Sequence, residues 1–348
     1  MKLTLAELNT GSMGHLVRDS DIIIRRHLES RAPITHKSEI VLFYASKNVA
    51  NSYFLDMLRN HIVIFPHWPW YLIDKFLYKI SKNYRIRRAK ILEITPDAIA
   101  KFSEFQKPLQ ISQKHTETMN SILWSLKVQK PYVCLVVRDS AYDSLHNPSS
   151  VHSQKYRHTP IEYFESSTQT LLKFGYSTVR MGRFSESTLM GAQGRVSDYS
   201  QQKSKQTDER DVRLFEECSF VLTTVTGPDE LGGFFRKKVY RVNASPISHA
   251  IEASHYPITL LSDYIQIDTN EKLSWSIIKK NNFHKKNADE LFEKYKICIV
   301  PKGQKAIRLF VELVCLTHPH KVSQLAHPRL DDFLKITKTI HIGKGLIY

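Results

Sequence analysis

The sequence predicts an α/β protein of two facing Rossmann-like domains followed by a helical C-terminal extension. Strands and amphipathic helices alternate over residues 2–80, and a second alternation starts at residue 132. Such alternation is typical of parallel sheets covered by helices. The chain has 348 residues, of which 42% are hydrophobic, so it can build two cores. The expected domains are residues 1–128 and 129–265, with the extension at 266–348.

The first half contains three short apolar runs, each followed by a segment with helical spacing. The expected order is strand 2–8, turn 10–15, helix to about 31, strand 39–45, helix 48–60, strand 61–65 and a helix around 73–80. Ile73, Phe76, Leu77 and Ile80 mark the last helix as amphipathic. Residues 97–130 are mixed in pattern and are expected to form a helical connection between the domains.

The second half opens with the most informative run of the chain, in which apolar residues 132–137 are followed at once by Arg138-Asp139-Ser140. This pattern predicts a strand buried on both faces that delivers charge at its C-terminal end. The polar segment 139–158 is long enough to suggest a functional loop. Further expected elements are helix 160–174, strand 176–181, polar residues 183–206, helix 208–217, strand 219–224, helix 227–236, strand 238–243, strand 296–300 and helix 305–316.

The charge balance indicates a negatively charged partner. Lys and Arg number 50 against 34 Asp and Glu, and the net charge of +16 suits nucleic acid, an acidic membrane surface or phosphorylated ligands alike. The start of the chain lacks the apolar core of a signal peptide, and no apolar run approaches the roughly 20 residues that span a bilayer. A cytoplasmic protein, peripheral on a membrane at most, is therefore expected. Buried reduced thiols are expected at Cys134, Cys218, Cys298 and Cys315.

Three strand ends of the second half carry groups that can bind an anion. Arg138 and Arg180 each end a strand, and Thr223–Gly227 join a third strand to a helix. Ligands of open α/β sheets bind at the carboxyl ends of the strands. The backbone N–H groups and hydroxyls of a Thr/Gly turn at a helix start suit a pyrophosphate. The same turn also fits an ordinary helix cap by Thr226, with Pro228 at the first helical position.

Several short motifs occur in one order along residues 130–265. They are VVRDSAY, Tyr156–Tyr163 ahead of a helix, Gly175-Tyr176, Val179–Gly182, Asp198-Tyr199, the helix at Asp211, the SFVLTTVTG turn and Val239–Ile247. In this succession the chain resembles a bacterial family of glycosyltransferases, which is similar in layout to GDP-fucose-dependent fucosyltransferases of GT-B architecture. The chain departs from the family at Thr224–Glu230, where a Thr-x-Ser-Gly turn is more usual. That change would alter the nucleotide or sugar preference, or weaken activity.

The resemblance implies transfer of a sugar from a nucleotide-diphosphate donor to a glycan or lipid-linked acceptor, in bacterial surface polysaccharide or glycoconjugate synthesis. The active site would lie in the cleft between the two domains. Arg138 would stabilise the β-phosphate as the sugar–phosphate bond breaks, so neither a metal ion nor another cofactor is expected.

Further roles follow from the same resemblance. Arg180 and Asp198 would lie near the nucleotide or brace loops through a salt bridge. Tyr156 and Arg157 would line a pocket or serve helix capping and packing. The donor-side residues are Arg180, Asp198, Thr224, Thr226 and Gly227, and the acceptor-side residues are Gly11, Gly14, Tyr156 and Arg157.

The first domain has a glycine-containing turn, Gly11-Ser12-Met13-Gly14-His15, between its first strand and helix. It resembles the glycine loop that GT-B N-terminal domains direct into the cleft, and an ordinary strand–helix turn is the alternative. His15, Asp139 and Asp143 are the candidates for a general base. Asp19-Ser20-Asp21 spells a DxD metal motif but falls within an expected helix, where a solvated helix face explains it.

Aromatic and basic residues at 68–90 suggest contact with an anionic surface. Residues 71–90 hold seven Lys and Arg against one acid, Asp74, and a basic amphipathic helix can lie on an anionic membrane. A core-packing helix with a solvated basic end is the alternative. His318, His320 and His327 flank prolines and are not expected to bind a metal.

Other classes of protein lose support because their motifs are missing. The sequence has no Walker loop, no full GxGxxG and no GxSxG elbow. The alternative to a glycosyltransferase is a non-catalytic basic binding protein on Rossmann-like domains, with an anionic membrane or nucleic acid as partner. No recognised nucleic-acid motif accompanies the charge, which makes nucleic acid the weaker of the two.

Overall fold

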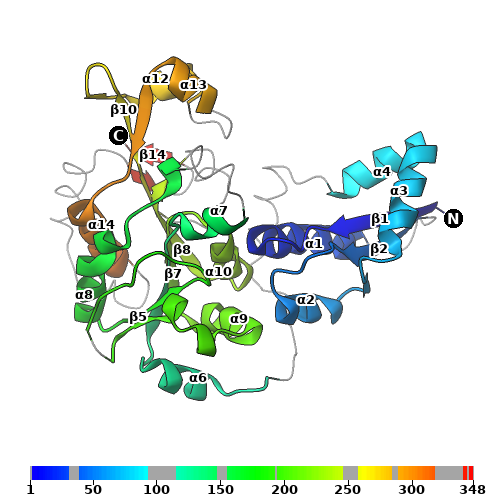
Figure 1. Ribbon diagram of the computed structural model, residues 1–348, viewed down its shortest axis with the longest axis horizontal. Coiled ribbons are helices and arrows are strands. Elements are labelled where there is room, and N and C mark those ends of the chain that lie inside the picture. Colours follow the sequence, from blue (N-terminus) through cyan, green and yellow to red (C-terminus); the bar gives the residue numbers. More distant parts are fainter. Residues whose placement is uncertain are drawn as a thin grey trace. The chain divides into compact units, whose positions relative to one another are not determined.

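The computed structural model describes the chain as two units, each with its own parallel sheet (Figure 1). Unit 1 is Met1–Thr116, Thr207–Glu216 and Glu230–Arg236, and unit 2 is Glu117–Gln206, Glu217–Asp229 and Lys237–Tyr348. The expected domain limits at 128 and 265 stay predictions. The described residues are 2–30, 39–92, 115–146, 155–192, 194–245, 258–283, 289–317, 340–342 and 345–347. Outside them lie His318, His320, His327, Pro246-Ile247 and much of the expected connection at 97–130.

The sheet of unit 1 follows the predicted alternation of strands and helices. Its order is β1-β2-β3, with β1 (Lys2–Leu8), β2 (Glu39–Ala45) and β3 (Ile64–Phe65) all parallel. After β1 the chain forms a π-helix at His15–Asp19, which continues into α1 (Ser20–Ser30). α2 (Ser52–Arg59) begins at Asn51, whose side chain accepts a hydrogen bond from the N–H of Phe54 at 2.7 Å. The first two expected strands are confirmed, and the third is shortened to two residues.

Two helices of unit 1 meet at Ser81 and pack on β1, namely α3 (Trp70–Ile80) and α4 (Lys82–Leu92). Leu77 of α3 packs against the cluster of Leu5, Tyr44 and Tyr84, as its helical spacing predicts. The other residues that mark this helix as apolar do not join the core. Ile73, Phe76 and Ile80 are 39%, 63% and 61% exposed.

Unit 2 contains an eight-stranded sheet in the order β14-β13-β9-β8-β7-β4-β5-β6. Six neighbouring strands, β6-β5-β4-β7-β8-β9, run parallel in the 3-2-1-4-5-6 order of a Rossmann fold. The last two strands pair antiparallel beside β9. The predicted α/β class with parallel sheets is confirmed. The bounds are β4 (Tyr132–Val136), β5 (Ser177–Met181), β6 (Val196–Asp198), β7 (Phe220–Thr223), β8 (Lys238–Ala244), β9 (Ile258–Leu261), β13 (Ile340–Ile342) and β14 (Gly345–Ile347).

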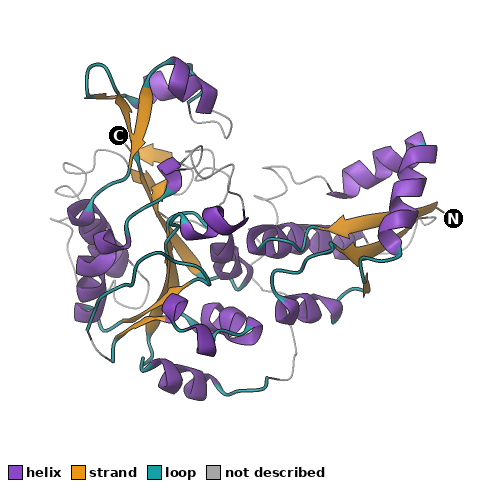
Figure 2. Cartoon of the chain, in the orientation of Figure 1, coloured by secondary structure: helices purple, strands orange, loops and turns teal. Residues whose placement is uncertain are grey.

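The core of unit 2 lies between this sheet and two helices, α8 (Glu165–Lys173) and α14 (Gln304–Thr317), which pack on each other. Val133 and Leu135 of β4 join this core, while Cys134 and Val136, which point to the opposite face, are buried as well. The predicted strand buried on both faces is therefore confirmed. The other helices of unit 2 are α6 (Met119–Leu126), α7 (Ala141–His146), α12 (Trp275–Lys280) and α13 (Asp289–Lys294) (Figure 2). Unit 1 also contains α9 (Asp208–Glu217), except for its last residue, and α10 (Glu230–Phe234).

The structure adds strands where the sequence predicts polar segments or helices. β6 lies within the polar stretch 183–206 and is only three residues long, so no alternating pattern marks it. The extension after residue 265 has its helices and the strand expected at 296–300, which is β12, but β12 belongs to an antiparallel sheet, β11-β10-β12, whose other two strands were not expected. The extension is therefore mixed and not purely helical. The bounds are β10 (Asp263–Gln266), β11 (Glu271–Lys272) and β12 (Ile297–Val300).

The four cysteines are free thiols. Three are buried as predicted, whereas Cys298 is half-buried. Burial raises the pKa of the Cys134 thiol well above its usual range. Across the described parts of the chain, every helix is too short or too polar to cross a membrane.

Candidate functional site

The candidate site lies where the strand order of the unit 2 sheet reverses, between β4 and β7. Arg138 follows β4 and Thr224 follows β7. The N–H of Arg138 donates to Oγ1 of Thr224 at 2.7 Å, and the N–H of Thr224 donates to the carbonyl of Val136 at 3.0 Å. The Arg138 carbonyl accepts from the N–H of Thr159 at 3.1 Å. Both backbone groups of Arg138 are thus fixed at the edge where α/β sheets bind ligands.

The turn after Thr224 contains a strained residue. Val225 has a φ of +63°, in the left-handed region that β-branched residues rarely adopt. The strain costs on the order of 1–3 kcal/mol and persists only where the surroundings enforce it. Arg157 enforces it in part, because its Nη2 donates to the Val225 carbonyl at 3.3 Å. Such strain concentrates at functional sites, which directs attention to this turn.

A buried carboxylate, Asp229, binds residues at both ends of the turn. Its Oδ2 accepts hydrogen bonds from Oγ1 of Thr223 at 3.0 Å and from the N–H of Thr226 at 3.3 Å. Burial raises the pKa of Asp229, against the opposing effects of Arg241 and these two donors. The Thr226 N–H, predicted to be open to a pyrophosphate, is therefore already bonded within the chain.

The hydroxyl of Thr226 differs from its N–H. Its Oγ1 is buried and has no hydrogen-bond partner within the described residues. The helix that follows is short, since Gly227–Asp229 form a 3-10 turn and α10 has only five residues. The backbone N–H groups of the turn therefore offer fewer hydrogen-bond donors to a ligand than predicted. The hydroxyl of Thr226 offers a donor that was not predicted separately.

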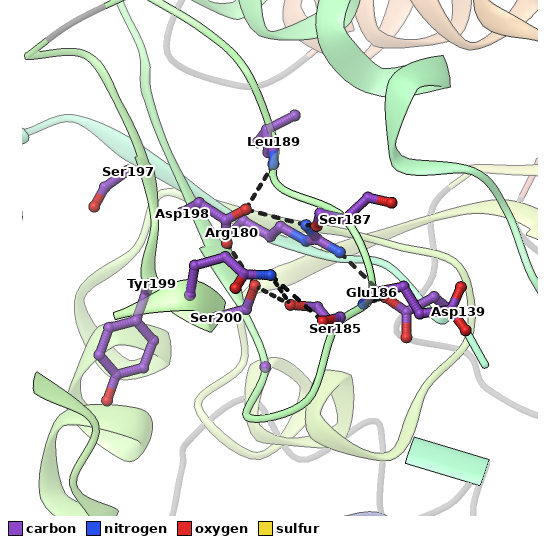
Figure 3. A network of polar contacts seen from close by, with 12 residues as sticks. Asp139, Arg180, Ser185, Glu186, Ser187, Leu189, Ser197, Asp198, Tyr199 and Ser200 are labelled. Carbon is purple, nitrogen blue, oxygen red and sulfur yellow. Dashed lines mark hydrogen bonds and ion pairs between the residues drawn. The ribbon is translucent and has the colours of Figure 1, made fainter. Parts of the chain in front are cut away.

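Arg180, at the end of β5, is enclosed by carboxylates (Figure 3). It is 1% exposed. Its Nη1 lies 3.0 Å from Oδ2 of Asp198 and its Nη2 lies 3.3 Å from Oδ2 of Asp139. Nη1 also donates to the carbonyl of Ser187. These contacts support the bracing role for Arg180 and Asp198, the second of their two expected roles.

The carboxylates around Arg180 hold the loop before β6 in place. Asp198 accepts from the N–H of Leu189 at 2.6 Å. Asp139 accepts from the N–H of Glu186 at 3.0 Å through Oδ2 and from the N–H of Ala141 at 3.1 Å through Oδ1. Both oxygens of Asp139 therefore already accept hydrogen bonds, which disfavours this residue as a general base. Asp143 lies in α7, and only its backbone is described.

The base candidate of unit 1 has an orienting partner. Nδ1 of His15 lies 2.6 Å from Oδ2 of Asp19, and the His15 side chain is 49% exposed. A carboxylate that holds one ring nitrogen leaves the other directed outward, which is the arrangement of a general base. Gly11 and Gly14 flank this turn in unremarkable backbone: a Cβ at Gly11 would meet only Asn9 Oδ1, at 3.9 Å, and Gly14 is right-handed helical.

The DxD sequence lies on a helix as predicted, but it is not solvated. Asp21 is 8% exposed and pairs with Arg25 at 2.7 Å and with Arg236 at 3.5 Å. Burial raises the pKa of Asp21, which the two arginines oppose. Asp19 is bound to His15 and Arg18. Within the described residues, no three His, Cys, Asp or Glu side chains gather as a metal site would require.

Tyr156 and Arg157, expected on the acceptor side, have contacts within unit 2. The Tyr156 ring lies edge-on to Phe292, with centroids 6.0 Å apart, as part of a hydrophobic cluster. These contacts fit the packing role, one of the expected alternatives. Arg157 instead bonds the strained turn, as described above, and so lies with the donor-side residues.

Some residues of this edge have no signal in the sequence. Asn243, in β8, has a φ of +53° and lies at a register shift between β8 and β9. Its Oδ1 accepts from the N–H of Lys302 at 2.6 Å, and its Nδ2 donates to Oγ1 of Thr159 at 3.3 Å. Lys302 in turn pairs with Asp263 at 2.7 Å. Asp229 does have a signal in the sequence. It lies three residues after Thr226, the spacing of a capping box, and this spacing could have indicated that its carboxylate accepts a hydrogen bond in the turn.

A scan against protein-family models and a search of curated proteins give no match. Among solved structures, the chain is similar to E. coli ADP-heptose LPS heptosyltransferase II (11% identity, TM-score 0.41, covering 71% of this chain and 86% of that chain). It is also similar to E. coli heptosyltransferase WaaC with ADP (10% identity, TM-score 0.35, 73% and 90%). A third is the dodecameric iron-containing heptosyltransferase TibC with ADP-D-beta-D-heptose (13% identity, TM-score 0.38, 71% and 61%). The fold assignment rests on the strand order of this chain.

Proposed function

We propose that this protein is a glycosyltransferase of GT-B architecture that moves a sugar from a nucleotide-diphosphate donor onto a glycan or lipid-linked acceptor. The observation that carries the proposal is the switch point between β4 and β7, where Arg138 and Thr224 are joined by a 2.7 Å hydrogen bond. Nucleotides bind at such switch points in Rossmann folds. The ordered motifs over residues 130–265 support the reaction class.

Arg138 is the proposed electrostatic catalyst. As the bond between the anomeric carbon and the β-phosphate oxygen breaks, the electron pair of that bond stays on the phosphate. A guanidinium group beside the phosphate stabilises this charge and suits bidentate contact. The two backbone hydrogen bonds of Arg138 reduce the reorganisation required of it. We propose that the reaction needs no metal ion because Arg138 supplies the positive charge.

The strained turn is the proposed pyrophosphate contact. Thr226 Oγ1 is buried and has no partner in the described chain, so it can donate to a phosphate oxygen. Thr224 acts differently, because its Oγ1 already accepts from Arg138 and its own proton stays available for donation. Gly227 follows at the start of the 3-10 turn.

The acceptor hydroxyl attacks the anomeric carbon and must lose a proton. His15 is the proposed base, since Asp19 holds its Nδ1 and leaves Nε2 to accept the proton. Asp139 is the weaker candidate because of its contacts with Arg180 and two backbone N–H groups. A fucose-like or heptose-like donor and a lipid-linked acceptor are the finer proposals. Free thiols at all four cysteines fit a cytoplasmic location.

Thermal unfolding with GDP, UDP, CMP and ADP tests the proposal. A ligand at about 100 times its Kd stabilises the folded state by roughly 2.7 kcal/mol, which raises the melting temperature by several degrees. At least one nucleoside diphosphate is expected to give this shift. If none stabilises the protein, while RNA binds tightly with a steep dependence on salt, the glycosyltransferase proposal is wrong and the basic binding protein is correct.

The matched control for the nucleotide panel removes a different arginine. Arg138→Ala is expected to reduce the shift to about half or less, since a ten- to 100-fold loss of affinity lowers the stabilisation from roughly 2.7 to about 1.4 kcal/mol or below. Arg59→Ala, which removes an exposed charge from the ion pair with Asp56 on α2, is expected to leave the shift intact. Equal losses in the two variants would show that the shift reflects net charge and not a site at β4.

A further inference from the structure

The outer side of α3 is an apolar surface with no partner among the described residues. Leu72, Ile73, Phe76 and Ile80 are 47%, 39%, 63% and 61% exposed, and we refer to these four residues as the α3 face. Trp68, just before the helix, is 65% exposed. Single exposed apolar side chains are common, but a continuous row on one helix indicates an interaction surface.

The orientation of α3 is fixed from the core side. Asp74 is 4% exposed and accepts hydrogen bonds from the hydroxyls of Tyr44 and Tyr84 at 2.6 and 2.5 Å and from Nε of Arg88 at 2.9 Å. Successive residues of an α-helix are about 100° apart, so Phe76 lies about 200° from Asp74. The carboxylate therefore turns the α3 face outward and holds it there.

Positively charged side chains lie beside the α3 face. Lys75 and Lys79 of α3 are exposed and lie on one flank of the apolar row, and Lys82 and Arg85 of α4 are exposed as well. The sequence from 71 to 90 holds a single acid, Asp74, and Arg88 neutralises it in the interior. The surface charge of this segment is therefore positive throughout.

We propose that the α3 face and its flanking lysines dock unit 1 onto an anionic lipid surface. An amphipathic helix with apolar side chains on one side and lysines at its edge lies in the headgroup region, with the lysines extended to the lipid phosphates. The apolar row enters the hydrocarbon boundary, and the charges at its edge select anionic lipids. This inference rests on the proposed function in one respect, since a lipid-linked acceptor would be presented at such a surface.

The apolar row distinguishes a lipid surface from a nucleic acid. Double-stranded nucleic acid is attracted mainly by the lysines and arginines, and exposed Leu, Ile and Phe side chains add little to contact with its phosphates. A lipid surface uses both, because burial of the apolar side chains and attraction of the charges contribute together. Removal of apolar residues and removal of charges therefore separate the two partners.

Co-sedimentation with vesicles tests the proposal. Vesicles of equal parts phosphatidylglycerol and phosphatidylcholine are compared with phosphatidylcholine alone, and binding is expected only to the anionic vesicles. Phe76→Ser is expected to weaken binding roughly ten-fold through lost apolar burial. Lys75→Gln with Lys79→Gln is expected to weaken it roughly 25-fold, since each lysine contributes roughly five-fold near an anionic surface.

Matched controls come from unit 2. Trp124→Ser removes a side chain that is 84% exposed on α6, and Lys279→Gln with Lys280→Gln removes two exposed charges from α12. Both are expected to keep vesicle binding within about two-fold of the unmodified protein, because neither change touches the α3 face or its flanking lysines. The same variants are also tested for nucleotide-induced stabilisation, which none of them should change. Loss of that stabilisation would count against the proposed function and not against docking.

Three outcomes would overturn the docking proposal. The first is that the unmodified protein does not co-sediment with anionic vesicles. The second is equal weakening by the α6 and α12 controls, which would show a general charge effect. The third is tight RNA binding that the lysine variant weakens and Phe76→Ser does not, with no binding to vesicles.

Discussion

Arg138 and Arg180 end adjacent strands of one sheet, yet the structure uses them differently. Arg180 is 1% exposed and bound by Asp139, Asp198 and the carbonyl of Ser187. Arg138 is half-buried, and the hydrogen bonds that fix it run through its backbone to Thr224 and Thr159. One arginine braces a loop, and the other is held by its main chain at the switch point. The position of an arginine at a strand end therefore does not by itself make it a ligand contact, because internal carboxylates can bind its head group, as they do for Arg180.

The largest expected effect is on stability, in Arg180→Ala. The variant leaves the carboxylates of Asp139 and Asp198 buried without their cation, and it is expected to lower the free energy of unfolding by about 3–5 kcal/mol. Urea denaturation measures this. Arg59→Ala, at an exposed pair, is the control and should cost less than about 1 kcal/mol. Equal costs in both would remove the bracing role.

Arg138→Ala is expected to show the reverse pattern. The free energy of unfolding should fall by less than in Arg180→Ala, because Arg138 is only half-buried and its backbone hydrogen bonds survive the substitution. Affinity for the preferred nucleoside diphosphate should fall roughly ten- to 100-fold, as for the loss of charge-assisted hydrogen bonds. Calorimetric titration measures the affinity. A variant that unfolds easily but binds normally would exchange the roles of the two arginines.

Asp229 is expected to affect stability less than Arg180. Asp229→Ala leaves Thr223 and Thr226 without their acceptor and should cost about 1–3 kcal/mol. Asp229→Asn keeps an acceptor oxygen and should cost less. Urea unfolding of both variants separates the two.

The pH dependence of stability gives Asp229 a second test. Its pKa is raised in the folded protein, so the folded state binds the proton more tightly than the unfolded state. Stability contributed by this group is therefore present at low pH and is lost as pH rises from the unfolded value of about 3.9 through the folded pKa. Asp229→Asn should flatten this part of the profile. An unchanged slope would show that the buried carboxyl does not titrate in this range.

The smallest expected effect is in the strained turn. Val225→Gly loses a buried side chain but removes the left-handed strain, so the two contributions nearly cancel. Val239, in β8, is 0% exposed and has no positive φ, so Val239→Gly should cost about 2 kcal/mol more than Val225→Gly. Equal losses of unfolding free energy in the two variants would show that Val225 is not strained.

The sequence predicts the parallel sheets because their strands are apolar runs that stop at polar turns. β4 and β7 are buried on both faces, and for this reason their residues are almost all apolar. β6 and β11 have three and two residues and owe their pairing to neighbouring strands. In the C-terminal part the sequence predicts β12 but not β10 or β11, which are too short to show a period.

The candidate site was predictable in its place but not in its details. Strand ends bring Arg138, Arg180 and Thr224 to one edge because parallel strands share their carboxyl ends. The bracing role of Arg180 depends on Asp139 and Asp198, whose distances from Arg180 along the chain are 41 and 18 residues. No local pattern encodes such a pairing. The positive φ of Val225 is likewise enforced from outside the turn, by Arg157.

A phosphate site at the end of β4 is tested most directly by calorimetric titration. The affinities for a nucleoside diphosphate and for its nucleoside are compared, in the unmodified protein and in Arg138→Ala. The diphosphate is expected to bind about 100-fold more tightly than the nucleoside, since two or more charge-assisted hydrogen bonds go to its phosphates. Most of this preference should disappear in Arg138→Ala and persist in Arg59→Ala. Equal affinity for diphosphate and nucleoside, or a preference that survives Arg138→Ala, would contradict a phosphate site at the end of β4.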